Sequence, residues 1–130
     1  MPLSNAYTQY NNSKILTASP AELVLMLYDG AIKFGNIAIG AIEEKDIQKA
    51  HNNIVKMQRI IDHLRMTLDM SYPVAKDFDR VYEYLARRLL EANTKKDKEI
   101  MVEVCTHLRS VRDTWKEVMR INREKGNLNG

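Results

Sequence analysis

The stretch from Ser19 to Ile42 constrains the fold of this chain most, because it reads as one long helix with a well-defined start. Ser19 can cap the helix, and Pro20 suits its first position. Glu22 follows three residues after the cap and completes a capping box. The sequence therefore predicts a helix that begins at Pro20 and runs to about Ile42.

The apolar surface of this predicted helix is unusually wide. At about 100° per residue, the polar side chains of Asp29, Lys33 and Asn36 fall in one narrow stripe, and apolar or small residues cover roughly the other 260°. A surface helix needs an apolar stripe only somewhat wider than about 100°. Either the helix is buried on almost every side within its own fold, or part of its apolar surface is kept for a partner.

Length and composition fit one domain in a reducing compartment. The chain has 130 residues, a length typical of a single domain with one core. No basic segment leads into an apolar stretch at the N-terminus, so we expect no signal peptide. Asp29, Lys33 and Asn36 interrupt the longest apolar run, which argues against a membrane span. The single cysteine, Cys105, cannot form an internal disulfide. We expect a cytoplasmic protein.

Apolar residues three and four positions apart predict three further helices. In the second helix they are Ile47, Ala50, Ile54, Met57, Ile61, Leu64 and Leu68. In the third they are Val74, Phe78, Tyr82, Leu85, Leu89 and Ala92, and in the fourth Met101, Val104, Leu108, Val111, Trp115 and Val118. The polar breaks between the helices are short, at residues 43–46, 69–73 and 93–98.

The predicted fold class is all-α, an antiparallel up-down-up-down four-helix bundle with crossing angles near about 20°. The bundle spans residues 19–125 and is followed by a disordered tail at 126–130. Residues 1–18 form a short N-terminal helical or extended cap segment, in which Tyr7 and Tyr10 stand three residues apart. This segment is either a frayed terminus or a cover across an apolar groove.

The residue pattern predicts no catalytic residue, metal or cofactor. None of His51, His63 and His107 has a glutamate three residues before it, as a di-iron bundle site requires. Cys105 lies on an apolar helix face, where a buried inert thiol is expected. A metal-binding bundle is therefore the least favoured function.

Three glycines within the first helix, Gly30, Gly35 and Gly40, point in three different directions. Each costs about 0.8–1 kcal/mol of helix stability relative to alanine. We therefore expect something large to approach the backbone there, either neighbouring helices or a bound segment.

The net charge of +3 does not indicate nucleic-acid binding. A basic stripe on the fourth helix has an acidic stripe right beside it, so the face is interpreted as solvated and self-paired. The basic residues are Arg109, Arg112, Lys116, Arg120 and Arg123, and the acidic ones are Glu99, Glu103, Asp113, Glu117 and Glu124.

The chain resembles the FliS family of flagellin-specific export chaperones. The residues that carry the resemblance are Asn5, Ala6, Tyr7, Tyr10, Ser19, Pro20, Leu23, Leu27, Tyr28, Asp29, Gly30, Ala31, Ile32 and Phe34, then Leu85, Arg88, Leu89, Ala92, Asn93 and Trp115. The chain departs from the family at Ser71, Tyr72 and Pro73, where a glycine-containing turn is common. The resemblance implies a protein that binds the disordered C-terminal segment of flagellin in a hydrophobic groove and prevents its premature polymerisation before export.

The resemblance also suggests a partner-binding surface. Leu25, Ile32 and Ile39 lie about 200° around the first helix from Leu23, so one of these two faces should meet the bundle and the other the client. We count Tyr28 with the partner-binding residues. Tyr7 and Tyr10 would cover the empty groove, and Met66 and Met70 would extend the client surface, because methionine adapts to varied partners.

Other partners remain open at this point. Other flagellar regulators or export components fit the same family, and an exposed groove also allows a homodimer without client. The runner-up function is a generic helical-bundle adaptor that binds another amphipathic helix.

Overall fold

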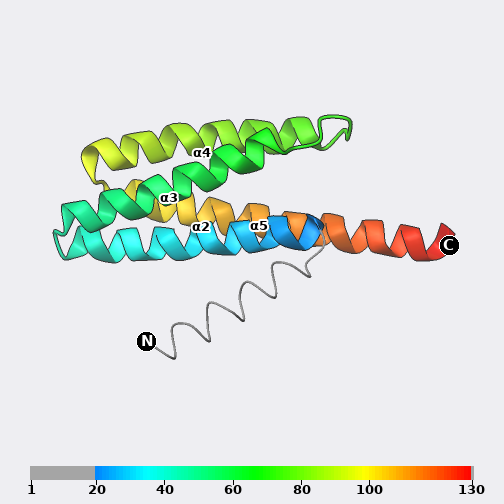
Figure 1. Ribbon diagram of the computed structural model, residues 1–130, viewed down its shortest axis with the longest axis horizontal. Helices are drawn as coiled ribbons and strands as arrows, with labels where there is room; N and C mark the ends of the chain where they lie inside the picture. The colour runs from blue at the N-terminus through cyan, green and yellow to red at the C-terminus, as the bar shows by residue number, and fades with distance from the viewer. Residues whose placement is uncertain (1–19, 130) are drawn as a thin grey trace, which may run out of the picture.

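In the computed structural model, the backbone is described for residues 20–129 and the side chains for residues 20–125. This part of the chain holds four helices and no strand: α2 Pro20–Glu43, α3 Ile47–Met66, α4 Ala75–Lys95 and α5 Lys98–Asn129. Successive helices run in opposite directions (Figure 1). The predicted all-α class and bundle are confirmed. Residues 1–18, for which a cap segment with Tyr7 and Tyr10 is predicted, lie outside the described residues. The predicted capping residue Ser19 does so as well.

The helices pack in a ring. Helix α2 contacts α3 and α5, and α4 contacts the same two helices from the opposite side. The core lies between them and is built from the predicted apolar stripes, with Ile54, Met57, Leu85, Leu89 and Leu108 fully buried. Two residues of the predicted stripes are exposed instead of buried, Ile47 at 54% and Val74 at 37%. Ile47 is the first residue of α3, and Val74 is the residue before α4.

Short polar connections separate the helices, as predicted. The side chain of Asp46 accepts a hydrogen bond from the backbone N–H of Lys49 and caps α3. Helix α4 ends at Lys95 and is capped by Lys96, which has a left-handed backbone (φ 51°) and donates its N–H to the carbonyl of Ala92. Between α3 and α4, the carboxylate of Asp69 accepts hydrogen bonds from the N–H and the hydroxyl of Ser71. This serine-based turn takes the place of the glycine-containing turn.

Helix α5 is longer than the sequence analysis expected. It continues to Asn129 and projects beyond the ends of the other helices (Figure 1). The predicted disordered tail, 126–130, thus overlaps the described end of this helix. Within the described part of α5 the one glycine is Gly126, and a single glycine costs a helix only about 1 kcal/mol.

The side of helix α2 that packs into the core lies between the two faces that the sequence distinguished. Its buried residues are Tyr28, Ala31, Ile32, Gly35, Ala38 and Ala41. This face lies between the directions of Leu23 and Ile32, because α2 packs against two helices at once. Ile32 belongs to the core at 7% exposure, whereas Leu23 is half-buried at the other edge.

The three glycines of α2 differ in their surroundings. A Cβ added at Gly35 would collide with the Sγ of Cys105 and come within 3.0 Å of the Cε of Met57. At Gly30 the nearest atom, the Cδ1 of Ile60, would be at an ordinary 3.7 Å, and at Gly40 nothing lies within 4 Å. Neighbouring helices therefore approach closely at Gly35, whereas at Gly40 no residue of the described chain does.

By length and composition, α2 also passes the test for a membrane-spanning helix. We expected the polar residues of this helix to argue against a membrane span. The mean hydropathy of α2 nevertheless stays high enough for one, despite Asp29, Lys33 and Asn36. One such helix is weak evidence for a span, because the core helix of a bundle passes the same test.

Candidate functional site

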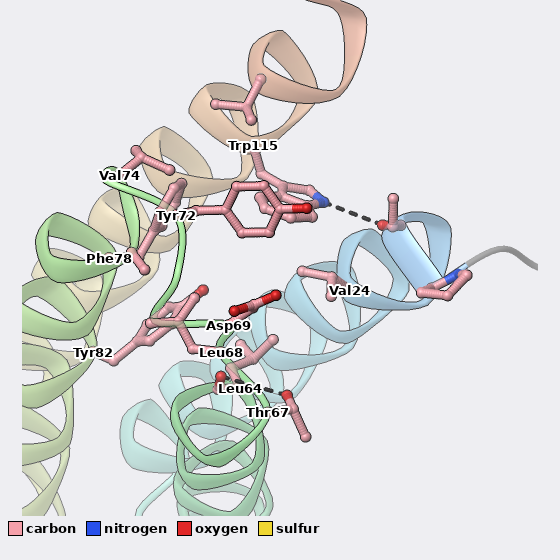
Figure 2. A pocket seen from close by; sticks show the side chains of 14 residues that line it. Val24, Leu64, Thr67, Leu68, Asp69, Tyr72, Val74, Phe78, Tyr82 and Trp115 are labelled. Atoms are coloured by element: carbon pink, nitrogen blue, oxygen red, sulfur yellow. Dashed lines mark hydrogen bonds between the residues drawn. The ribbon is translucent and has the colours of Figure 1, made fainter. Parts of the chain in front are cut away.

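An apolar pocket of about 230 Å³ opens at the end of the bundle where α2 begins and α3 leads into α4. Side chains from all four helices and from the α3–α4 connection surround it (Figure 2). The lining residues are Pro20, Ala21, Val24, Leu64, Thr67, Leu68, Asp69, Tyr72, Val74, Ala75, Phe78, Tyr82, Trp115 and Val118. Most of these side chains are aliphatic or aromatic, so the pocket suits an apolar occupant.

Trp115 fixes one wall of this pocket. Its indole Nε1 donates a hydrogen bond of 3.1 Å to the backbone carbonyl of Ala21 in the first turn of α2 (Figure 2). The indole edge also meets the ring of Phe78, with 5.9 Å between the ring centroids and an interplanar angle of 81°. Trp115 thereby joins α5 to the beginning of α2 and to α4.

A chain of aromatic rings continues from this wall into the core. Phe78 lies 6.2 Å from Tyr82, and Tyr82 lies 6.4 Å from Tyr28, measured between ring centroids. The hydroxyl groups of Tyr28 and Tyr82 hydrogen-bond to each other. Burial raises the pKa of both phenols above its ordinary value. The floor of the pocket is therefore uncharged, and its buried hydroxyl groups are already paired.

Exposed apolar side chains concentrate in the chain segment that borders the pocket through Thr67, Leu68, Asp69 and Tyr72. Met66 is 84% exposed, Tyr72 60% and Met70 53%, and all three belong to the end of α3 or to the connection that follows. Val74, just before α4, is also exposed, and the other large exposed apolar residues of the described chain are far apart in sequence: Ile47 on α3, Leu90 on α4, and Val102 and Ile121 on α5. We call Met66, Met70 and Tyr72 the rim.

One acidic group also lies at the mouth. Asp69 lines the pocket, and its hydrogen bonds from Ser71 lower the pKa of its carboxyl group. The carboxylate is thus charged at neutral pH, beside an otherwise apolar surface.

A second hollow, of about 280 Å³, runs between α4 and α5 and shares Val74 and Phe78 with the pocket. Its other lining residues are Asp77, Val81, His107, Ser110, Val111 and Thr114. Val74 and Phe78 therefore stand between the two hollows and line both.

The structure brings together only some of the predicted partner-binding residues. Met66 and Met70 lie at the rim, as parts of one exposed segment. Leu25 and Ile39 are half-buried on α2, and Ile39 packs against the core. Tyr7 and Tyr10 lie outside the described residues.

Two of the predicted contacts need correction. Tyr28 is completely buried and Ile32 is 7% exposed, so neither side chain can face a partner directly. The sequence analysis had placed them on a possible client face. Their direction is set by the rotation of α2 between α3 and α5, which the helical period alone does not give.

The sequence analysis also missed part of the site. Phe78, Tyr82 and Trp115 were assigned to core stripes, and Tyr72 was noted only as a departure from the family turn. Tyr72 did carry a signal, because an aromatic residue in a short polar connection has little local reason to be there. No sequence signal could have shown that the three core aromatics border a pocket.

The described residues hold no group of three or more histidine, cysteine, aspartate or glutamate side chains that could bind a metal ion. His51 pairs with Asn93, and the ring of His107 meets that of Tyr84. Burial raises the pKa of the Cys105 thiol, which disfavours the reactive thiolate.

The family model described as flagellar protein FliS matches residues 3–122 of this chain. The chain belongs to the FliS family. It is 37% identical over 124 residues to the flagellar secretion chaperone FliS of Bacillus subtilis, covering 95% of this chain and 93% of that protein. It is 32% identical over 117 residues to FliS of Salmonella typhimurium, with 87% of each chain covered.

A solved structure described as a flagellar chaperone from bacteria has the same fold, with a TM-score of 0.72. The match covers 90% of this chain and 97% of that one at 14% identity. The FliS relatives are named as secretion chaperones, a role that is not enzymatic. Membership of the FliS family supports a flagellar export chaperone role for this protein.

Proposed function

We propose that this protein is a cytoplasmic export chaperone that binds the disordered C-terminal segment of flagellin. Binding holds the segment in a largely helical form, prevents premature polymerisation and assists flagellar type III export. One observation carries the proposal: an apolar pocket with an exposed apolar rim, in a chain of the FliS family.

The physical support lies in how an amphipathic helix docks. Such a helix places apolar side chains from successive turns into a hydrophobic groove. The pocket at Trp115 has the volume for one large apolar side chain, and the rim offers apolar area beside it. The hollow between α4 and α5 continues this surface through Phe78. A disordered segment that folds on this surface offsets its ordering cost through the apolar area it buries.

The proposed contact surface consists of the rim together with the pocket wall. Met66 and Met70 contact the client directly, joined by Tyr72 and Trp115. Leu25 and Ile39 lie on α2 and contribute where their half-buried side chains reach the surface. Tyr28 and Ile32 act from the core, by holding α2 and Tyr82 in place.

Residues 1–18 have a proposed role as a cover. Pro20 lines the pocket, so the preceding residues are attached at its edge. Tyr7 and Tyr10 are proposed to cover the pocket when no client is present and to move aside or contact flagellin when it is bound.

A titration with the flagellin C-terminal segment tests the proposal. We expect micromolar or tighter binding by calorimetry, together with a rise in helical circular dichroism beyond the sum of the separate spectra. A peptide of identical composition in scrambled order is the control and should give neither signal. Absence of binding to the cognate segment would contradict the proposal.

The same titration, repeated with unrelated amphipathic helices, separates this function from that of a generic adaptor. An adaptor would bind unrelated amphipathic helices as tightly as the flagellin segment, whereas the proposed chaperone prefers the flagellin segment. Size measurements with and without peptide report on a client-free homodimer, which the exposed rim permits. Other flagellar regulators and export components are further proposed partners.

A further inference from the structure

The chain has seven methionines, and two of them belong to the rim. Among the methionines that the structure describes, these two have the most exposed side chains. Met66 ends α3, and Met70 lies in the connection between Asp69 and Tyr72, which both line the pocket. In contrast, Met57 and Met101 are fully buried, and Met26 and Met119 are half-buried. Exposure therefore divides these thioethers into an exposed pair, a half-buried pair and a buried pair.

We propose that Met66 and Met70 form an oxidation site through which hydroperoxides weaken client docking. This inference rests on the proposed function of the rim as a docking surface. It adds a chemical switch that acts on that surface and leaves the core of the bundle unchanged.

The reaction needs only the thioether and a peroxide. A sulfur lone pair attacks one oxygen of hydrogen peroxide, an S–O bond forms and the O–O bond breaks. The oxygen now bonded to sulfur passes its proton to the departing hydroxide, which leaves as water. The sulfur is oxidised by two electrons to the sulfoxide, and the peroxide is reduced. The reaction rate depends on access of the peroxide to sulfur, which the structure grants at the rim and denies at Met57 and Met101.

The product changes the chemistry of the rim. A thioether is apolar and adapts to varied partners, whereas a sulfoxide is a strong hydrogen-bond acceptor that favours water. Covering a sulfoxide with an apolar client leaves its oxygen without a partner, which is unfavourable. Neither side chain belongs to the buried core, so oxidation of Met66 and Met70 should change the stability of the fold little.

Peptide mass spectrometry tests the first step without any client. Trypsin should release residues 66–76 as one peptide that holds both rim methionines, and fragmentation assigns the added oxygen to Met66 or Met70. We expect both to be oxidised at least about tenfold faster than Met57 and Met101. Equal rates at rim and core methionines would overturn the inference.

Binding to the flagellin C-terminal segment tests the second step. The chaperone alone is oxidised, the peroxide is removed with catalase, and the unoxidised peptide is then added. We expect affinity to fall about tenfold, with an unchanged thermal unfolding curve, and to return after treatment with methionine sulfoxide reductases. The double variant Met66→Leu/Met70→Leu is compared with itself before and after peroxide treatment, and we expect its affinity to be the same in both states.

The outcomes separate the two proposals. If the oxidised and untreated proteins bind equally well, the switch is wrong and the chaperone function stands. If the double leucine variant loses affinity on peroxide treatment as the natural sequence does, the rim methionines are not the switch. If the untreated protein does not bind the segment at all, the proposed function fails and this inference fails with it.

Discussion

The backbone of Gly35 in α2 lies directly against the thiol of Cys105 in α5, so closely that a Cβ at position 35 would collide with it. Met57 of α3 closes the same space, with its Cε 3.0 Å from that Cβ position. Three helices thus meet at one residue without a side chain. The contact fixes how deeply α2 sits between its two neighbours.

Replacing this glycine should destabilise the bundle. Gly35→Ala forces a methyl group into filled space, which costs about 1–3 kcal/mol and outweighs a gain of about 0.8–1 kcal/mol in helix propensity. Gly40→Ala meets no atom within 4 Å and should stabilise by up to about 1 kcal/mol. Urea unfolding followed by circular dichroism measures both. If the two variants gain equal stability, the close contact at Gly35 is wrong.

The buried hydroxyl pair should behave as a unit. Tyr28→Phe or Tyr82→Phe alone leaves one buried hydroxyl without its partner and should cost about 1–3 kcal/mol. The double phenylalanine variant removes both hydroxyls and should cost less than the sum of the single changes. A double-mutant cycle from urea unfolding measures the coupling. Strictly additive losses would show that the hydroxyls do not depend on each other.

Stability should fall in alkaline solution because of the same pair. Burial raises the pKa of Tyr28 and Tyr82 in the folded state above the ordinary value of 10.0. The two phenols therefore contribute fully to the free energy of unfolding below about pH 10. This contribution is lost as the pH rises further, because the unfolded chain releases phenol protons that the folded chain retains. The loss approaches about 1.4 kcal/mol per pH unit for each phenol. The free energy of unfolding, measured from about pH 8 to about pH 11, should fall less steeply in the double phenylalanine variant.

A charge at Ile32 should unfold the protein. Ile32 is 7% exposed within the core, so Ile32→Asp both removes packing and buries a carboxylate, at a cost of about 3 kcal/mol or more. Leu90→Asp, at a position 63% exposed on α4, is the control and should stay near the natural stability. Thermal unfolding compares them. A folded Ile32→Asp protein that has lost only peptide binding would restore Ile32 to the client surface.

Tyr72 should matter for client binding. Tyr72→Ser removes an aromatic ring from the rim and should weaken binding of the flagellin segment about tenfold, because aromatic side chains dominate binding energy at such surfaces. Leu90→Ser is matched in exposure, at 63% against 60% for Tyr72, and lies away from the pocket lining. It should leave the affinity unchanged, as measured by calorimetry. Equal effects from both variants would place the client elsewhere.

Much of the fold was predictable because it is encoded locally. The stripe Ala50, Ile54, Met57, Ile61 and Leu64 repeats at helical spacing, and all five residues are buried as predicted. Helix ends were accurate where a local signal exists, as at Asp46, whose side chain caps α3. The end of α5 was placed too early, because Gly126 is only a weak stop signal.

The candidate site was predictable only in part. Met66 and Met70 were predicted from their positions off the apolar stripe of the second predicted helix, which is a local property, and both side chains are exposed. Tyr28 was counted with the partner-binding residues and the face of Ile32 was left open, whereas both side chains are buried. The rotation of α2 about its axis depends on packing against α3 and α5 together. The helical period fixes which residues share a face, and it does not fix where that face points.

The sequence by itself determined the helices, their order, the bundle class and the family of this protein, because periodicity, caps and matching residues are properties of neighbouring positions. Only the tertiary structure decided that Val24, Phe78 and Trp115 border one pocket and that Gly35 must lack a side chain. Residues from α2, α4 and α5 meet there only after the helices have packed. Their relative depth and rotation are set by the volumes of many side chains at once.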